Sequence, residues 1–457
     1  MRKWTLHFSL LLAVAFPICA VTSDAPGLKP IHFTDTRLDN GLRILLAPDP
    51  SAPVVALDVT YDVGSSNERP GRTGFAHLFE HMMFQGSENV GKGEHFTLLE
   101  NNGGDFNGTT NEDRTTYYEI VPKNQLDLAL FLEADRMGKL AVNQTNLDNQ
   151  RNAVQEERRL GIDNQPYGKA FLEIDSLAYD CFGYKHSTIG SMADLNAASL
   201  DDVKDFFRIY YAPNNAVLSL VGDFDPAEAT AKIKKYFGAI PSQPAAPKKQ
   251  ACEEERYGER HETVMDPLAR LPMVIIAYQI PAGNTAENFA VQALGSILGT
   301  GQSSRFYQHL VKEKQLATSF EMQVDARMGP SLIYIIAYPR PGVKPGDLEK
   351  AIYEEISAVA KDGVTAAELS KAQMQYRRKE VKIRESALRT SLRLGHDAVY
   401  FNDPNLINTD MDKFNAVTAD DVKEAAQKYF APNLRAVVTT LPAASGEQSA
   451  GAQGGQQ

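Results

Sequence analysis

The chain has 457 residues, of which 43% are hydrophobic and 23% are charged, the composition of an ordinary soluble globular protein. This length exceeds what one hydrophobic core usually serves, so we expect two or more domains. The net charge of −11 argues against a nucleic-acid partner, which needs a basic face, whereas a cationic or extended polypeptide substrate is compatible with it.

The first twenty residues have the pattern of a secretory signal peptide. Arg2 and Lys3 precede an apolar run over 6–18, and Ala20 offers a small residue for cleavage. A membrane anchor is the alternative, but the run is short for a spanning helix of about 20 residues. We therefore predict a signal peptide over 1–20, export to the periplasm, and a mature protein without stable membrane insertion.

The sequence His77-Leu78-Phe79-Glu80-His81 lies in a predicted helix over 74–84. On a helix its two imidazoles, four residues apart, share one face with the carboxylate. Such a pair of imidazoles can bind one Zn²⁺, and a carboxylate that does not bind the metal can take a proton from zinc-activated water. The order His-x-x-Glu-His is the one found in inverted zincins.

Polar and small residues alternate over 103–110, a stretch that includes Asn107, Gly108 and Thr109. This pattern suits an exposed edge strand that pairs with the extended backbone of a substrate. The alternative is a hairpin turn at Asn107-Gly108, because Asn-Gly is a favoured turn pair.

Two histidines do not complete a catalytic zinc site, which usually has three protein ligands. The predicted helix over 147–159 offers Glu157 as the third. Heptad spacing places Ala153, Glu157 and Leu160 on one face, which predicts that Glu157 points inward. The alternative is a solvated glutamate paired with a neighbouring arginine.

An internal repeat relates the two halves of the chain. Residues 199–214 and 418–433 share eight of sixteen positions at an offset of 219, and each reads as a capped helix followed by a strand. Apolar strands after Pro53 and Pro272 are related by the same offset. The repeat predicts an α+β fold of two homologous domains, each an antiparallel-rich sheet packed with helices.

The second copy carries none of the motif's chemistry, because the offset places Ser296, Gly299 and Thr300 opposite its His, Glu and His. We expect an N-terminal zinc-binding domain over 30–240, a proline-rich charged linker over 241–256, a C-terminal inactive domain over 257–442, and a tail over 443–457 too poor in apolar residues to fold. Cys181 and Cys252 remain after cleavage of the signal peptide, and the sequence leaves open whether they form a bridge.

Together, His77-x-x-Glu80-His81, the segment Arg151-Asn-Ala-Val-x-x-Glu157 and the stretch over 103–118 resemble the pitrilysin or insulinase family of zinc metallopeptidases, which includes the mitochondrial processing peptidase. The segment 301–305, Gly-Gln-Ser-Ser-Arg, extends the resemblance into the second half. The resemblance implies one Zn²⁺ per chain held by His77, His81 and Glu157, with Glu80 as general base. It also implies substrate contacts from Asn107, Gly108 and Thr109, and a supporting hydrogen bond near the zinc from Gln150, where some relatives carry a glutamate.

The chain departs from the family in one respect. Complete members have Leu-Arg-x-x-x-x-Leu-x-Tyr in the second half, where Arg and Tyr bind the substrate and the tetrahedral intermediate. Here Val311 stands in place of the Arg and has no donor for an oxyanion, and Thr318 stands in place of the Tyr and cannot reach as far as a phenol would. Lys312 is a possible substitute but is expected to be a solvated helix residue, and Arg305 is expected to be structural.

Split members of the family divide these parts between paralogous subunits, and this chain resembles the zinc-bearing one. We therefore predict a zinc-dependent endopeptidase that hydrolyses peptides or unfolded polypeptide segments and needs a partner carrying the Arg/Tyr pair, as a heterodimer. Alternatives are a noncatalytic binding or assembly subunit and a self-sufficient peptidase. A structural zinc protein is disfavoured, because the chain has no cysteine cluster.

Overall fold

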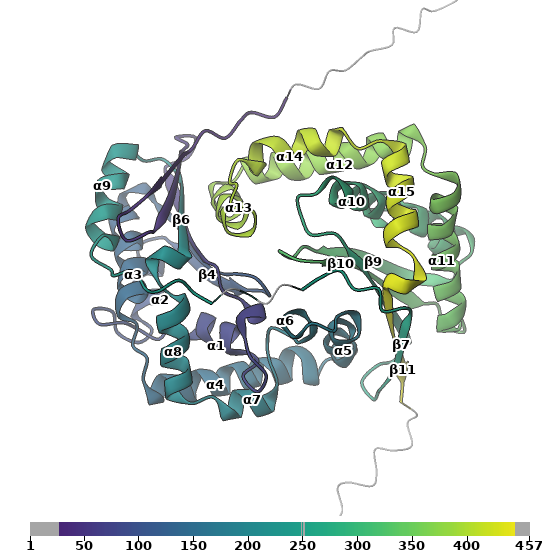
Figure 1. Ribbon diagram of the computed structural model, residues 1–457, viewed down its shortest axis with the longest axis horizontal. Coiled ribbons are helices and arrows are strands. Elements are labelled where there is room, and N and C mark those ends of the chain that lie inside the picture. The colour runs from purple at the N-terminus through teal and green to yellow at the C-terminus, as the bar shows by residue number, and fades with distance from the viewer. Residues whose placement is uncertain (1–26, 248, 250–251, 444–457) are drawn as a thin grey trace, which may run out of the picture. The chain divides into compact units, whose positions relative to one another are not determined.

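The computed structural model describes residues 27–247, 249 and 252–443 (Figure 1). The predicted signal peptide and nearly all of the predicted tail lie outside the described residues. From Ile31 onward the chain forms one compact unit that contains two sheets with helices packed on them. This confirms the predicted α+β fold. No helix among the described residues has the length and apolarity needed to cross a membrane.

The first sheet has the strand order β1-β2-β6-β3-β5-β4. Its strands are β1 (Thr34–Arg37), β2 (Arg43–Pro48), β3 (Val54–Tyr61), β4 (Asp105–Thr110), β5 (Thr115–Pro122) and β6 (Ala216–Gly222). β2 and β6 run parallel, and the other neighbours run antiparallel. Among the described residues, β4 pairs with no strand other than β5, so its outer edge is free of a neighbouring strand.

The second sheet repeats this pattern with the order β7-β11-β8-β10-β9. Its strands are β7 (Arg260–Asp266), β8 (Met273–Ile280), β9 (Ala317–Asp325), β10 (Ser331–Pro339) and β11 (Arg435–Pro442). β7 and β11 run parallel, as β2 and β6 do in the first sheet, and the other neighbours run antiparallel. β8 begins 219 residues after β3, and β11 begins 219 residues after β6, so the repeat read from the sequence is a repeat of structure.

The helices of the first half are α1 (Phe75–Met82), α2 (Glu94–Asn101), α3 (Leu126–Lys139), α4 (Gln144–Arg158), α5 (Gly168–Ala178), α6 (Phe182–Lys185), α7 (Met192–Ala197), α8 (Leu200–Tyr210) and α9 (Pro226–Phe237). Those of the second are α10 (Ala286–Gly299), α11 (Pro345–Asp362), α12 (Ala366–Arg384), α13 (Ala387–Tyr400), α14 (Leu406–Asn415) and α15 (Ala419–Tyr429). The repeated segments begin α8 and α15 with the same reciprocal cap, in which a Ser or Thr side chain and an Asp three residues later satisfy each other's backbone N–H groups.

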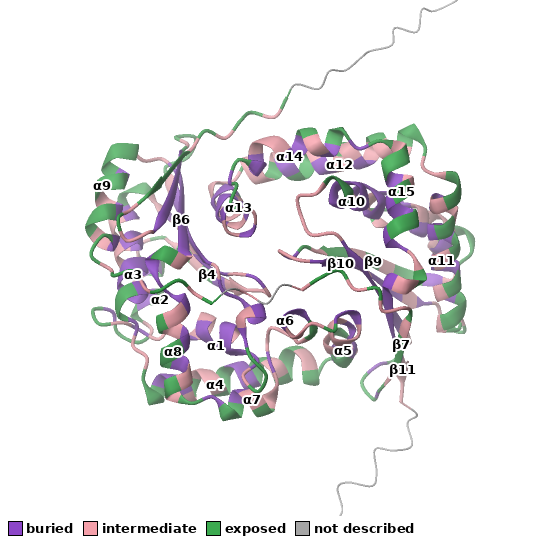
Figure 2. Ribbon diagram, viewed as in Figure 1, coloured by how far each residue is buried: buried purple, intermediate pink, exposed green. Residues whose placement is uncertain are grey.

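Two helices are exchanged between the halves. α5, from the first half of the sequence, packs Ala170, Ile174 and Ala178 against β8, β10 and β11. α13, which begins 219 residues later, packs Leu394 and Ala398 against β2 and β6 of the first sheet. Figure 1 shows α13 beside β6 and α5 beneath the second sheet, and Figure 2 shows these strands buried. Each sheet is therefore covered on one face by a helix from the other half.

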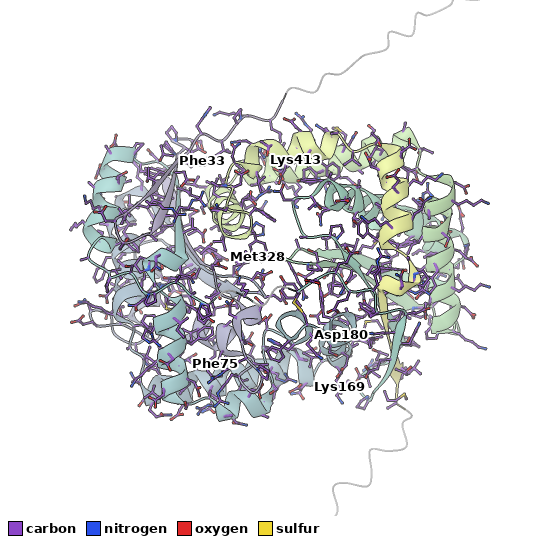
Figure 3. The ribbon with its side chains drawn as sticks, in the orientation of Figure 1. Phe33, Phe75, Lys169, Asp180, Met328 and Lys413 are labelled. Carbon is purple, nitrogen blue, oxygen red and sulfur yellow. A yellow bond between two sulfur atoms is a disulfide. The ribbon has the colours of Figure 1, made fainter. Side chains whose placement is uncertain are left out.

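The hairpin turn between β4 and β5 lies at the junction of the halves. Asp113 accepts hydrogen bonds from the Tyr184 hydroxyl at 3.0 Å and from the Met328 backbone N–H at 2.8 Å. Figure 3 labels Met328 in the loop that joins β9 to β10, close to the first half. Cys181 and Cys252 form a disulfide with Cα atoms 5.7 Å apart, which settles the question that the sequence left open. The second half thus holds the turn that follows the free edge strand.

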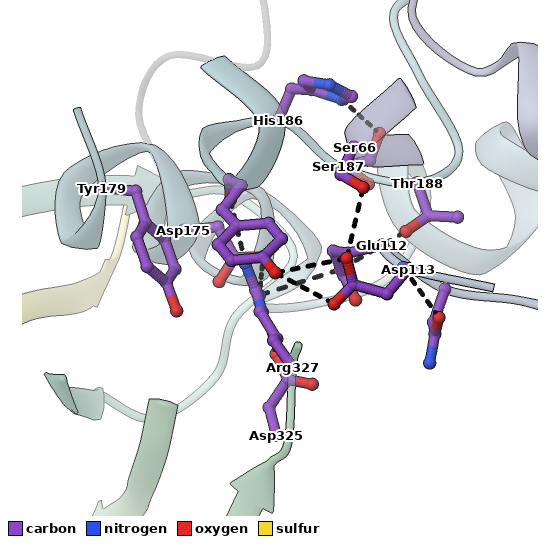
Figure 4. Close-up of polar contacts among 12 residues, drawn as sticks. Ser66, Glu112, Asp113, Asp175, Tyr179, His186, Ser187, Thr188, Asp325 and Arg327 are labelled. Carbon is purple, nitrogen blue, oxygen red and sulfur yellow. Dashed lines mark hydrogen bonds and ion pairs between the residues drawn. The ribbon is translucent and has the colours of Figure 1, made fainter. Parts of the chain in front are cut away.

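A buried guanidinium completes this junction. Arg327 lies 2.7 Å from an Asp325 oxygen, 3.5 Å from Asp175 and 3.7 Å from Glu112, and it is almost entirely shielded from solvent (Figure 4). Three carboxyl groups from β9, α5 and the hairpin turn therefore surround one cation. Because unpaired buried charge is costly, this cluster fixes the relative placement of the segments that contribute to it.

Candidate metal centre

The helix that carries the motif begins at an unusual cap. Gly74 precedes α1 with φ of 88° and has no side chain to satisfy the first backbone N–H groups. The buried carboxylate of Glu68 does so instead, accepting from Gly74 N at 2.9 Å and Ala76 N at 2.8 Å. The apolar side of α1 then enters the core of the first half, and this leaves the motif's polar side chains on the other side.

The imidazoles of the motif converge with a carboxylate from α4. His77 Nε2 and His81 Nε2 lie 3.6 and 3.2 Å from the same Glu157 oxygen. The three groups' candidate ligand atoms all lie within 4.8 Å of one another. Ligands of a tetrahedral zinc about 2.0–2.2 Å from the ion are about 3.3–3.5 Å apart. The spacing and chemistry of these side chains therefore fit a zinc ion.

The face of α4 differs from the one expected. Ala153, Glu157 and Leu160 were predicted to point inward, but all three are exposed, with 49% of the Glu157 side chain accessible. The prediction was wrong because the core takes Val154 and Leu147 instead. Glu157 is also not the partner of a neighbouring arginine; that role falls to Glu156, 3.0 Å from Arg159. Glu157 faces the imidazoles across the gap between α1 and α4.

The environment sets the charges of these groups. Burial and the neighbouring His81 lower the pKa of His77 to about 4, which favours the neutral imidazole that binds metals. A hydrogen bond with His81 lowers the pKa of Glu157 and keeps it anionic. Burial raises the pKa of Glu80, with a hydrogen bond to Thr110 acting the other way. Of the motif's residues, Glu80 is the one outside the group of candidate ligands.

The edge strand passes directly over Glu80. A Cβ at Gly108 would lie 2.9 Å from Glu80 Cγ and 3.3 Å from the Phe84 ring, so the strand and α1 approach as closely as they do because position 108 has no side chain. Asn107 and Gly108 lie within β4, and the turn is at 111–114; the alternative of an Asn-Gly turn is therefore wrong. Thr109 is held by Arg114, which donates to its carbonyl at 2.8 Å.

The remaining candidates lie away from the imidazoles or have other partners. Gln150 is half-buried on α4, and no hydrogen bond among the described residues joins its amide to His77 or His81. Arg305 forms a two-pronged ion pair with Glu368 at 2.6 and 2.9 Å, the structural role expected for it. Lys312 lies 5.5 Å from the Tyr307 ring centre, and Thr318 donates to the Pro339 carbonyl.

Sequence reasoning overlooked Glu68 and Arg114. Glu68 is nine residues before His77. Its role could have been predicted from the glycine at the start of α1, because a glycine has no side chain to cap the helix and another residue must accept its hydrogen bonds. Arg114 ends the hairpin turn, and its charge opposes the rise that burial causes in the pKa of both Glu80 and Asp58. A lone arginine in a polar turn gives no such indication in the sequence.

Comparison with known proteins agrees with this geometry. Residues 43–190 match the model of the insulinase family, peptidase family M16, and residues 197–376 match that of the peptidase M16 inactive domain. Zinc protease PqqE of Helicobacter pylori is 30% identical over 447 residues, covering 95% of this chain and all of that protein. The crystal structure of a protease from Helicobacter pylori superposes with a TM-score of 0.86 at 29% identity, over 90% of this chain and 100% of that one.

A more distant structure shows the same fold. The first half of the periplasmic protease PqqL from Escherichia coli has a TM-score of 0.73 at 20% identity, with 90% of this chain and 93% of that chain covered. Against the whole of PqqL, the chain covers 48% of that protein. The motif on α1, its carboxylate on α4, the duplicated sheets and a 30% identical relative over nearly the full length all lead to one assignment: this chain belongs to the M16, or pitrilysin/insulinase, family of peptidases.

Proposed function

We propose that the protein is a zinc-dependent endopeptidase that hydrolyses peptides or unfolded polypeptide segments. The observation that carries the proposal is the convergence of His77, His81 and Glu157 within 4.8 Å of one another, with Glu80 beside them and outside the ligand group. Four closed ligands would suit a structural ion, whereas three leave a position open for chemistry. Zinc protease PqqE of Helicobacter pylori, similar along the whole chain, carries that activity in its name.

The residues of this chain have distinct roles in the proposed reaction. When bound, Zn²⁺ would supply Lewis acidity that polarises a carbonyl and makes water a stronger acid. Glu80 accepts the proton that water gives up and returns it to the leaving amine, and its partial burial suits a base that must release the proton again. The free edge of β4 binds the substrate backbone as an added strand, and Glu68 fixes the first turn of α1.

We further propose that the chain works with a paralogous subunit in the periplasm. Val311 has no donor for an oxyanion, the Thr318 hydroxyl donates to the Pro339 carbonyl, and Arg305 is engaged with Glu368. A partner carrying an Arg/Tyr pair would supply the missing donors. The match of this chain to about half of a periplasmic protease of Escherichia coli supports a two-unit enzyme.

The test is peptide hydrolysis by the purified mature chain, alone and with such a paralogue, combined with metal analysis. One zinc per chain is expected, with activity lost to a chelator and restored by zinc. Glu80→Gln should keep the metal and lose turnover by at least about a hundredfold, whereas His81→Ala should lose the metal. Equal zinc loss in both variants would contradict the separate roles. Zinc binding without hydrolysis, with or without the partner, would favour a noncatalytic binding subunit, and full activity of the chain alone would refute the need for a partner.

A further inference from the structure

A cavity of about 460 Å³ lies on the face of the first sheet that α13 covers. Thr60 on β3 and both Thr116 and Tyr118 on β5 form its floor, and side chains of α10, α12 and α13 form its walls. The cavity reaches the free edge of the sheet, because Thr109 of β4 also lines it. It is therefore adjacent to the strand on which we propose that substrate binds, on the face opposite to the one that meets α1.

The carboxylates of this cavity already have cationic partners. Arg393 lies 2.5 Å from an Asp397 oxygen and also pairs with Asp410, and both carboxylates line the cavity. Behind it, Glu380 pairs with Arg393 and Arg384. The negative charge at this end of the cavity is thus balanced by the protein itself.

Two other cations in the cavity wall, Arg114 and Lys379, are not held in close ion pairs of this kind. Among the described residues, no carboxylate oxygen lies within 4.0 Å of the Arg114 guanidinium or of the Lys379 ammonium. Arg114 donates to the Thr109 carbonyl, and Lys379 Nζ lies 5.7 Å from the centre of the Tyr376 ring. Desolvation by the surrounding protein and the nearby Arg393 lower the pKa of Lys379, while the charges of Glu380, Asp410 and Asp397 act in the other direction.

The alternation of a β-strand connects this cavity to the substrate. Gly108 faces Glu80, so its neighbours Asn107 and Thr109 face the opposite side of the sheet. A substrate strand paired with β4 follows the same alternation. Side chains on one side of that strand would point to α1, and those on the other side would point toward the cavity.

We propose that this cavity is a substrate subsite for a carboxylate, supplied by an Asp or Glu side chain of the bound strand or by the C-terminus of the peptide, with Lys379 and Arg114 as its cationic partners. This inference rests on the proposed peptidase function and deepens it by naming a substrate class. It gives local specificity to a protein whose overall charge of −11 would otherwise repel acidic peptides.

Peptide binding to the full-length mature chain tests the subsite without requiring turnover. Glu80→Gln protein loaded with zinc would be titrated against fluorescent peptides that carry Glu, Gln or Lys at successive positions, each with an amidated or a free C-terminus. We expect Glu to lower the dissociation constant about tenfold relative to Gln. This effect should appear only at alternate positions of the peptide, whose side chains point toward the cavity. If the C-terminus is the source, the free acid should bind more tightly than the amide, wherever Glu stands.

Variants of two lysines on α12 separate the subsite from general charge effects. Lys379→Met should abolish the preference for a carboxylate, and Lys379→Glu should reverse it in favour of Lys peptides. Lys382→Met makes the same change at another position of the same helix outside the cavity, and it should keep the preference. Thermal unfolding would confirm that the three variants are folded.

The other outcomes would refute the proposed subsite. Equal affinities for Glu, Gln and amidated peptides would refute the subsite, and so would a preference for a carboxylate that survives Lys379→Glu. In both cases neutral peptides would still bind, so the peptidase proposal would stand. Equal losses from Lys379→Met and Lys382→Met would show a long-range charge effect in place of a site. Failure of every peptide to bind, both to this chain alone and in the presence of the paralogous subunit, would refute both proposals together.

Discussion

The two halves of this protein share one architecture and differ in the contact between two helices. In the first half, α1 and α4 meet at His77, His81 and Glu157. In the second, α10 and α12 meet at the equivalent place through Ser296 and Gln375, and the Gln375 amide also donates to the Thr300 carbonyl at 3.5 Å. The fold therefore provides the same crossing twice, once with metal-binding chemistry and once with neutral hydrogen bonds.

The difference shows what the second half contributes. Its helix α13 packs on the first sheet, and α5 of the first half packs on the second sheet. Its β9–β10 loop donates a hydrogen bond to the turn beside the edge strand. The half without the metal-binding motif therefore makes structural contacts that the other half needs. If this view is correct, changes at the junction should affect the whole unit, and matched changes outside it should not.

The largest effect is expected at Arg327. Arg327→Met removes the buried cation that three partly buried carboxyl groups share, so we expect a loss of about 3–5 kcal/mol in the free energy of unfolding, measured by urea denaturation. The control is Arg260→Met, which breaks the more exposed pair with Asp180 at 2.7 Å and should cost less than about 1 kcal/mol. Similar losses for both would show that the junction has no special role.

The disulfide should have the next largest effect. Cys181 and Cys252 are 71 residues apart, and cross-links closing loops of this length typically stabilise proteins by about 2–4 kcal/mol through the entropy of the unfolded chain. Double replacement by serine should lower the free energy of unfolding by that amount. A reductant should lower the midpoint of the natural protein and leave the double variant unchanged. A variant that still responds to the reductant would contradict this assignment.

Local patterns in the sequence predicted the elements well and their partners less well. The helix that carries the motif and the repeated capped helices were predicted within a few residues, because caps and apolar periodicity are local signals. The exchange of α5 and α13 could not be predicted, since an apolar helix face does not specify which sheet covers it. The same limit explains the error at Glu157: heptad spacing assumes a core on one side, but this face of α4 meets two imidazoles.

A glycine on α13 tests how closely that helix fits the first sheet. A Cβ at Gly395 would lie 2.1 Å from an Asp58 oxygen, and Asp58 is fixed by a hydrogen bond of 2.5 Å from Thr116. Gly395→Ala should therefore cost about 1–3 kcal/mol in the free energy of unfolding. Its counterpart at the repeat offset is Ser176 on α5, which makes only local contacts through its hydroxyl, so Ser176→Ala should cost less than about 1 kcal/mol. Equal costs would mean that the two exchanged helices are packed alike.

A further effect, expected at Glu112, depends on pH. Burial raises its pKa from 4.5 to about 7, with Arg327 acting in the other direction and Asp325 and Asp175 adding to the rise. Between these two pH values the folded protein holds a proton that the unfolded chain has released, so stability present at low pH is lost as the pH rises toward 7. Glu112→Gln has no such proton to lose. Its free energy of unfolding should therefore gain on the natural protein by about 2–3 kcal/mol between pH 4.5 and 7, and by little more above pH 7. Denaturant titrations across this pH range would measure the difference in the free energy of unfolding between Glu112→Gln and the natural protein. Both proteins keep Asp175 and Asp325, so the contributions of these residues largely cancel in the difference. Parallel profiles would show that Glu112 is ionised throughout and that Arg327 compensates its burial fully.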